Sequence, residues 1–286
     1  MMEAEARPRP RVPLSRRLEV TALWALLVLT VRQQIRGRKG LFLVGVYLLA
    51  CVIALALRTL AVPVSSQVLE FDLIFTLVPQ ALAPLTALLY ASGMIQDEVE
   101  EQTLTYLLVR PLPRWALYLT KWLGTLFVSM VLTAFMSTLL LLAAHWGDES
   151  IGRTALLERA WKVAVLLSLA QLTYCSVFAG LSLLFRRSLI LGVAYVVVLE
   201  GFVSKIDFIV RLVTVMFYYR VLSLRWLDLT PEQATSWRLK WHIDLETAPS
   251  LENCVLILVC ASLIVTALST LRFSLQEFRM KTPEST

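Results

Sequence analysis

The chain has 286 residues, of which 58% are hydrophobic, and its mean hydropathy is +0.70. Soluble proteins have roughly 45–50% apolar residues, so this composition excludes a soluble fold and indicates one polytopic membrane domain. The net charge is +6, and the four cysteines form no C-x-x-C pair, so we expect neither a disulfide framework nor a zinc site.

The first apolar stretch, residues 18–31, is short and has basic residues at both ends. Its length of about 14 residues is below the roughly 20 that a spanning helix needs. It also ends without the small residues of a signal-peptide cleavage site. We therefore predict an amphipathic elbow helix that lies on the membrane surface, within a cytoplasmic segment 1–40. An additional span over 18–31 is the alternative.

Longer apolar runs follow, and they predict six transmembrane helices. The fifth is the shortest, and only three residues separate it from the fourth, so these two are expected to form a tight hairpin. The runs cover residues 41–57, 71–92, 115–144, 161–185, 189–203 and 254–271.

The distribution of Lys and Arg orients these spans. With six spans, segments 1–40, 93–121, 186–188 and 272–286 lie on one side and carry 17 of the 27 Lys and Arg but 9 of the 21 acids. Cytoplasmic loops carry such an excess of basic residues. We expect a multi-pass protein of the cytoplasmic (inner) membrane with both termini in the cytoplasm. Topology and anionic lipid explain the basic charge, so no nucleic-acid partner is expected.

Polar residues in or beside the spans are candidates for a pathway or gate. Gln80 lies between Pro79 and Pro84, which loosen the backbone hydrogen bonding of the second span. It either lines a pathway or shapes the bundle. Glu200 lies near the outer end of the fifth span, where snorkelling towards the headgroups with Lys205 as partner is favoured over a proton relay.

Residues 204–253 are too polar to span and are predicted to form an outer amphipathic region. Polar residues recur there at helical spacing, which predicts a helix that rests on, or dips into, the outer leaflet before the last span. Its polar face consists of Asp207, Arg211, Thr214, Tyr218 and Arg225. Asp207 and Arg211 are candidate gate residues over a substrate exit, and a surface-seated connector is the alternative.

Residues 93–114 connect the second and third spans and are strongly amphipathic. Acids gather where a helix is expected to begin, which suits the positive end of its dipole. Apolar residues after them recur on one helical face, and Pro111 and Pro113 stop the helix. Acids oppose anionic lipid, so a basic protein partner explains them better than a helix lying flat on the membrane. The acids are Asp97, Glu98, Glu100 and Glu101, and the stripe is Val99, Thr103, Leu104, Leu107 and Leu108.

No catalytic motif accompanies this segment. The nearest approach to a phosphate-binding loop, residues 147–154, has Arg where that motif has Lys and follows a span rather than a strand. The sequence has no G-x-S-x-G and no H-E-x-x-H. We therefore do not expect this chain to be an enzyme by itself.

The stretch GMIQDEVEEQTLTYLLVRPLPRWALYLTKWLG, residues 93–124, resembles the signature of the type-2 ATP-binding-cassette (ABC) exporter permeases. The elbow, six spans and outer helix also agree with that family's plan. The matching residues are Gly93, Glu98, Glu101, Thr103, Leu104, Leu107, Leu108, Arg110, Pro111, Arg114 and Lys121.

The resemblance implies an all-α polytopic membrane protein whose first cytoplasmic loop is a coupling helix seated in a groove of an ATPase. The residues that it assigns to this contact are Asp97, Glu98, Glu101, Thr103, Leu104, Leu107, Leu108, Arg110 and Arg114. The chain has no nucleotide-binding domain of its own, so ATP and Mg are expected on a separate ATPase and no cofactor on this chain.

Two copies of the permease, or one copy and a paralogue, would pair, contact membrane lipid and recruit two ATPase subunits. The expected function is export across the membrane, driven by ATP hydrolysis. A non-transporting anchor, through which the ATPase drives an envelope machine for motility or secretion, is the alternative. Because the spans contain few polar residues, a lipid-like substrate, or none, fits better than a large hydrophilic one.

Overall fold

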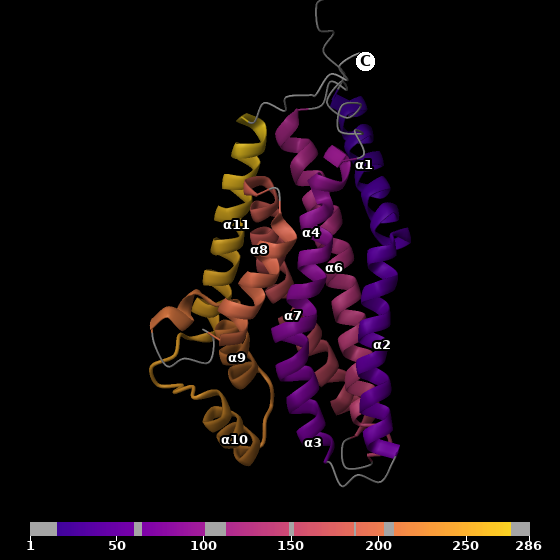
Figure 1. The fold of residues 1–286 in the computed structure, drawn as a ribbon. Coiled ribbons are helices and arrows are strands. Elements are labelled where there is room, and N and C mark those ends of the chain that lie inside the picture. Colours follow the sequence, from indigo (N-terminus) through magenta and orange to yellow (C-terminus); the bar gives the residue numbers. More distant parts are fainter. Residues whose placement is uncertain are drawn as a thin grey trace, which may run out of the picture.

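The computed structural model describes residues 16–59, 65–100, 113–148, 152–185, 187–202 and 209–275, with the backbone alone for 16–20, 96–100, 202, 209 and 210. Within these ranges every regular element is a helix (Figure 1). The α-helices are α1 (Arg16–Arg36), α2 (Arg38–Thr59), α3 (Ser66–Leu69), α4 (Ala83–Glu100), α6 (Arg114–Ala144), α7 (Arg153–Leu184), α8 (Ser188–Tyr195), α9 (Val215–Trp226), α10 (Pro231–Trp241) and α11 (Leu251–Leu275). Two π-helices, η1 (Glu70–Leu82) and η2 (Val196–Phe202), and a 3-10 helix, η4 (Ile209–Val213), complete the set.

Five helices are long and apolar enough to cross a bilayer, in agreement with five of the six predicted spans. They are Arg38–Thr59, Ser66–Ile95, Arg114–Ala144, Arg153–Leu184 and Leu251–Leu275. The predicted fifth span is found as a shorter apolar helix, Ser188–Gly201. Its 14 described residues rise about 21 Å at 1.5 Å per residue. Residues 203–208 lie outside the described structure, so a crossing by this segment stays a prediction.

Helix α7 is the centre of the bundle and packs against α4, α6, α9 and α11. Small residues allow close approaches, as is usual for helices packed in membranes. A Cβ at Gly180 would lie 2.9 Å from Ser269 Oγ of α11. A Cβ at Gly192 would lie 2.1 Å from Leu88 Cδ1, so α8 is pressed directly onto α4. The outward faces of α2, α8 and α11 remain apolar and exposed.

The predicted elbow is a longer helix than expected, and it is oriented differently. Figure 1 shows α1 extending along the bundle in line with α2, rather than lying flat across it. Both helices pack along α6. Thr30 is buried there, 3.1 Å from the position that a Cβ of Gly124 would take, and Gln34 Nε2 donates to Thr125 Oγ1 at 3.4 Å. The side of α6 supplies the packing surface for α1, and the sequence of 18–31 does not reveal it.

The prediction that two prolines loosen the second span is confirmed. Residues 70–82 form a π-helix, and at its end the Ala83 N–H donates to Val78 O, five residues back. The next residue, Pro84, has no N–H, so it cannot donate to Pro79 O in the same pattern. The carbonyl of Pro79 is therefore open to a donor from outside the helix.

The helix predicted before the last span is present, and it lies deeper in the bundle than a helix resting on the leaflet surface. Helix α9 exists, but residues 215–224 are all buried, against α7 and α11. Thr214 begins the helix by accepting from Phe217 N at 3.4 Å. Helix α10 follows and covers η1, because Trp237 and Trp241 pack on Phe71 with ring centroids 5.3 and 5.2 Å away. The helical spacing of polar residues in the sequence therefore belongs to a helix that is buried in the bundle.

Candidate functional site

The predicted coupling residues lie at the boundary of the described structure. Helix α4 continues past Gly93, where the second span was expected to end, and reaches Glu100, with Asp97 and Glu98 in its last turns. Arg114 is the first residue of α6. The other predicted contact residues, Glu101, Thr103, Leu104, Leu107, Leu108 and Arg110, lie outside the described residues. Their role as an ATPase contact therefore stays a prediction.

The helices on either side of the predicted coupling segment, α4 and α6, contact each other. Lys121 of α6 is 3% exposed, and its Nζ donates to Met94 O of α4 at 3.4 Å. One turn before Lys121, Tyr118 packs on Phe273 of α11 with ring centroids 5.6 Å apart. The last turns of α4 are thus fixed to α6, and α6 to α11.

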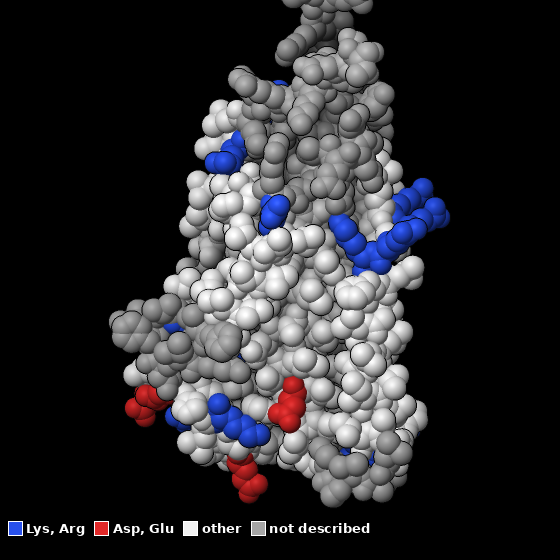
Figure 2. Space-filling model, viewed as in Figure 1, with Lys and Arg blue, Asp and Glu red and all other residues white. Residues whose placement is uncertain are grey.

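Basic residues concentrate at the junction of the first two helices. Arg32, Arg36, Arg38 and Lys39 belong to the end of α1 and the start of α2. In the view of Figure 2, described basic side chains lie on the upper half and also at the lower end, and the visible acids lie towards the lower end. A basic α1–α2 junction is expected if the end with the α4–α6 connection faces the cytoplasm.

Glu200 is placed differently from the prediction. The side chain is fully buried, so it does not snorkel to the headgroups. Its carboxylate accepts from the first amides of α9, Val215 N at 3.2 Å and Met216 N at 3.0 Å, and from Tyr195 Oη at 3.4 Å. A carboxylate is stabilised at the positive end of a helix dipole, so Glu200 fixes the N-terminus of α9 inside the bundle.

A buried arginine on the same helix was not expected from the sequence. Arg220 of α9 is 3% exposed, and its guanidinium carbon lies 5.8 Å from the ring centre of Trp241. The available signal was one arginine inside the run 215–224, which is otherwise mostly apolar.

The remaining candidate gate residues are less central. Gln80 is half-buried in η1. Arg211 donates to His242 O at 2.9 Å and lies over the ring of Phe217 at 5.1 Å, so it joins the start of α9 to the end of α10. Asp207 lies outside the described residues. The structure therefore brings Glu200 and Arg211 to the same end of α9 and leaves Gln80 on a different element.

A second buried cluster, also missed, lies between η1, α6 and α7. Glu70 is fully buried, and its Oε1 lies 2.6 Å from Arg159 Nε and its Oε2 3.6 Å from His145 Nε2. His145 follows the last residue of α6, and burial lowers its pKa, which favours the neutral ring. Arg159 is therefore the charged partner of Glu70. Glu70 precedes the predicted span by one residue, so it was left out of the apolar run.

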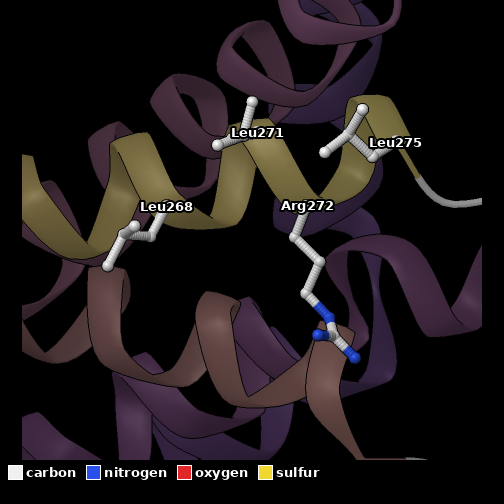
Figure 3. Close-up of a pocket in the computed structure, with 4 residues that line it drawn as sticks. All are labelled: Leu268, Leu271, Arg272 and Leu275. Carbon is white, nitrogen blue, oxygen red and sulfur yellow. The ribbon is translucent and has the colours of Figure 1, made fainter.

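A cavity of about 430 Å³ opens beside α11 near its C-terminal end. The described residues that line it are Leu268, Leu271, Arg272 and Leu275. Figure 3 shows that the leucines line α11, whereas the Arg272 side chain extends away from it towards a neighbouring helix. An apolar wall with a cation at its end matches an amphiphile with an anionic head.

A family model described as ABC-2 family transporter protein matches residues 24–278, which extend from α1 to just beyond α11. No curated protein matches the chain.

Proposed function

The chain belongs to the ABC-2 family of transporter proteins, and on this premise we propose that it is the transmembrane subunit of an exporter driven by a separate ATPase. The protein is a multi-pass membrane protein, and the family's permeases work with a cytoplasmic ABC ATPase. The proposal places it in the cytoplasmic membrane with both termini inside. ATP and Mg bind the partner ATPase, and this chain supplies the path and the moving helices.

The observation that carries the proposal is the unbroken helix from Ser66 to Glu100, formed by α3, η1 and α4. Its last turns contain Asp97 and Glu98 and are held on α6 by Lys121. A force applied to the segment after Glu100 is transmitted along a single helix to the far side of the bundle. The backbone is helical throughout, with the π pattern over Glu70–Leu82 and the α pattern after it.

We further propose that two copies of the chain pair and recruit two ATPase subunits. The exposed apolar faces of α2 and α11 exceed what a monomer in water would show, and lipid or a second copy covers them. A paralogue would meet the same surface. Mass measurement of the intact complex distinguishes one permease chain from two, and identical chains from different ones.

Reversing the charges of Glu98 and Glu101 tests the ATPase contact. We expect Glu98→Lys with Glu101→Lys to weaken binding of the ATPase about tenfold and to uncouple ATP hydrolysis from transport, because like charges then face each other across the interface. Membrane insertion is expected to be unchanged. Co-purification of the ATPase and its affinity for the permease in detergent or nanodiscs are the measurements.

A matched control carries the same charge change at the opposite end of the molecule. Glu232 begins α10 and Glu246 follows it, both exposed, and Glu232→Lys with Glu246→Lys is expected to leave ATPase binding unchanged. Export by the Glu98/Glu101 variant at the wild-type level would contradict the proposed coupling role. If both double variants weakened ATPase binding equally, the effect would come from the change in net charge and not from a contact at Glu98 and Glu101.

The mechanical alternative keeps one specific argument in its favour. The outer half of the bundle is filled by α9, whose residues 215–224 are all buried, so this region is packed rather than lined by a polar path. Reconstituted permease–ATPase complex separates the two functions. ATP-dependent movement of a lipid-like probe between leaflets supports export, and ATP hydrolysis without such movement supports the mechanical role.

Membrane lipid is the proposed occupant of the cavity beside α11. We expect Arg272→Gln to lower the affinity for phosphatidylglycerol about fivefold, since one Arg near an anionic membrane surface contributes about 1 kcal/mol. Arg36→Gln removes an exposed arginine on α1, away from the cavity lining, and is expected to have no such effect. Native mass spectrometry with phosphatidylglycerol, and with phosphatidylcholine as the neutral lipid, measures both. Equal lipid binding by the two variants would contradict the site.

A further inference from the structure

Gln171 of the central helix α7 is fully buried, and its side chain lies against the second span. Its amide, oriented by its partners, donates from nitrogen to Ala83 O at 3.1 Å and accepts from Ala87 N at 3.2 Å. Ala83 and Ala87 are four residues apart, so these two groups are the pair that the α-helical pattern brings together. One side chain of α7 therefore binds both members of a backbone pair in α4.

This backbone pair lies where the second span changes from a π-helix to an α-helix. Helix η1 gives way to α4 at Ala83, and Pro84 supplies no N–H there. On the other side of the junction, Pro79 O accepts from Tyr174 Oη of α7 at 3.4 Å. Helices bend most readily where a proline or an inserted side chain interrupts the backbone hydrogen bonding. Gln171 and Tyr174, three residues apart on one face of α7, thus bind backbone groups on both sides of this weak point.

The junction lies between the two ends of the span that the proposed function connects. Towards the cytoplasm, α4 continues to the last turns that contain Asp97 and Glu98. In the other direction, α3 and η1 lead to the outer end of the span, residues 66–72. If the junction bends freely, it absorbs a movement of α4. The movement reaches the outer end only if the angle at the junction is held.

We propose that Gln171 is a positioning residue that braces the junction between η1 and α4, so that movement of α4 reaches the outer end of the second span. This inference rests on the proposed function, because it takes the ATPase as the source of that movement. Removal of the amide leaves Ala83 O and Ala87 N as partners for each other, so the helix itself does not depend on Gln171. The brace therefore acts on bending at the junction and not on helix formation.

Hydrogen exchange at the two ends of the span tests the brace. It is measured over residues 66–72 and 96–100 in the permease–ATPase complex, with and without a non-hydrolysable ATP analogue. We expect the nucleotide to change exchange at both ends of the wild type about two- to tenfold, the effect of gaining or losing one hydrogen bond. Gln171→Met keeps the length of the side chain and removes both hydrogen-bonding groups. It is expected to keep the response at 96–100 and to lose the response at 66–72.

Thr173→Val is the matched control on the same helix. Thr173 is also buried, and its hydroxyl donates to Leu258 O of α11 at 3.4 Å, so this variant likewise removes a bond between helices, away from the junction. It is expected to respond at both ends like the wild type. A purely structural loss at Gln171 would change exchange equally with and without nucleotide, and the response to nucleotide would remain.

A second variant keeps a polar side chain at the same position. Gln171→Asn retains an amide that is one methylene shorter, so it no longer reaches both backbone groups. It is expected to lose the response at 66–72 as Gln171→Met does, and it carries the test if Gln171→Met does not fold.

The outcomes separate the two proposals. The inference is overturned if either Gln171 variant responds at 66–72 like the wild type, if Thr173→Val loses that response equally, or if the wild type responds at 96–100 alone. In each of these cases the ATPase still binds and acts on α4, so the permease function stands. If no ATPase binds the wild-type chain, the proposed function fails, and the inference fails with it.

Discussion

Replacement of Glu70 by alanine is expected to lower the free energy of unfolding by about 3–5 kcal/mol. The carboxylate is fully buried and lies 2.6 Å from Arg159 Nε, whose side chain is 15% exposed. Without Glu70, a largely buried guanidinium faces a neutral His145, and the desolvation of its charge is no longer offset. Unfolding in mixed micelles, followed by circular dichroism, measures the change.

A neighbouring acid on α7 provides the control. Glu158 is 64% exposed and pairs with Lys162 at 2.9 Å, one turn along the helix. Such exposed pairs contribute roughly 0.3–0.5 kcal/mol, so Glu158→Ala is expected to be nearly neutral. The double variant Glu70→Leu with Arg159→Met removes both charges together and is expected to recover most of the loss. Equal destabilisation by Glu70→Ala and Glu158→Ala would contradict the importance of burial.

Replacement of Glu200 by alanine is the second large effect, because it leaves two buried amides, Val215 N and Met216 N, without their acceptor. Each buried donor left unsatisfied costs about 1–3 kcal/mol, and the loss releases the start of α9 from the bundle. Rapid hydrogen exchange over residues 215–224 is therefore expected. Glu200→Gln retains one acceptor oxygen and is expected to have an intermediate effect.

The cap of α10 offers a matched comparison for this variant. Thr230 accepts from Gln233 N at 3.3 Å and forms a capping box with it, on an exposed helix. Thr230→Ala is expected to lower stability by about 1 kcal/mol and to leave exchange in α9 unchanged. If Glu200→Ala changed exchange in α9 no more than Thr230→Ala, the carboxylate would not be what holds that helix.

Two misplaced elements show the limits of the sequence. Polar residues at helical spacing, from Asp207 to Arg225, led to a helix that rests on or dips into the outer leaflet, whereas residues 215–224 are buried in the bundle. The carboxylate of Glu200 accepts from the first amides of this helix, and it comes from another helix, 15 residues before Val215. Glu70 was overlooked for a related reason, since Arg159 is 89 residues away. The spacing of residues along one helix does not show which residue of another helix will contact them.

The sequence by itself determined the membrane class, five of the spans, the loosened hydrogen bonding around Pro79 and the family pattern of residues 93–124. These follow from run length, from the missing N–H of proline and from local residue order, which do not depend on the rest of the fold. Only the tertiary structure decided that α1 lies along α6, that α8 packs directly onto α4, and that α9 is buried. Each of these depends on which helix faces which, and side-chain packing and charge pairing between distant segments decide that.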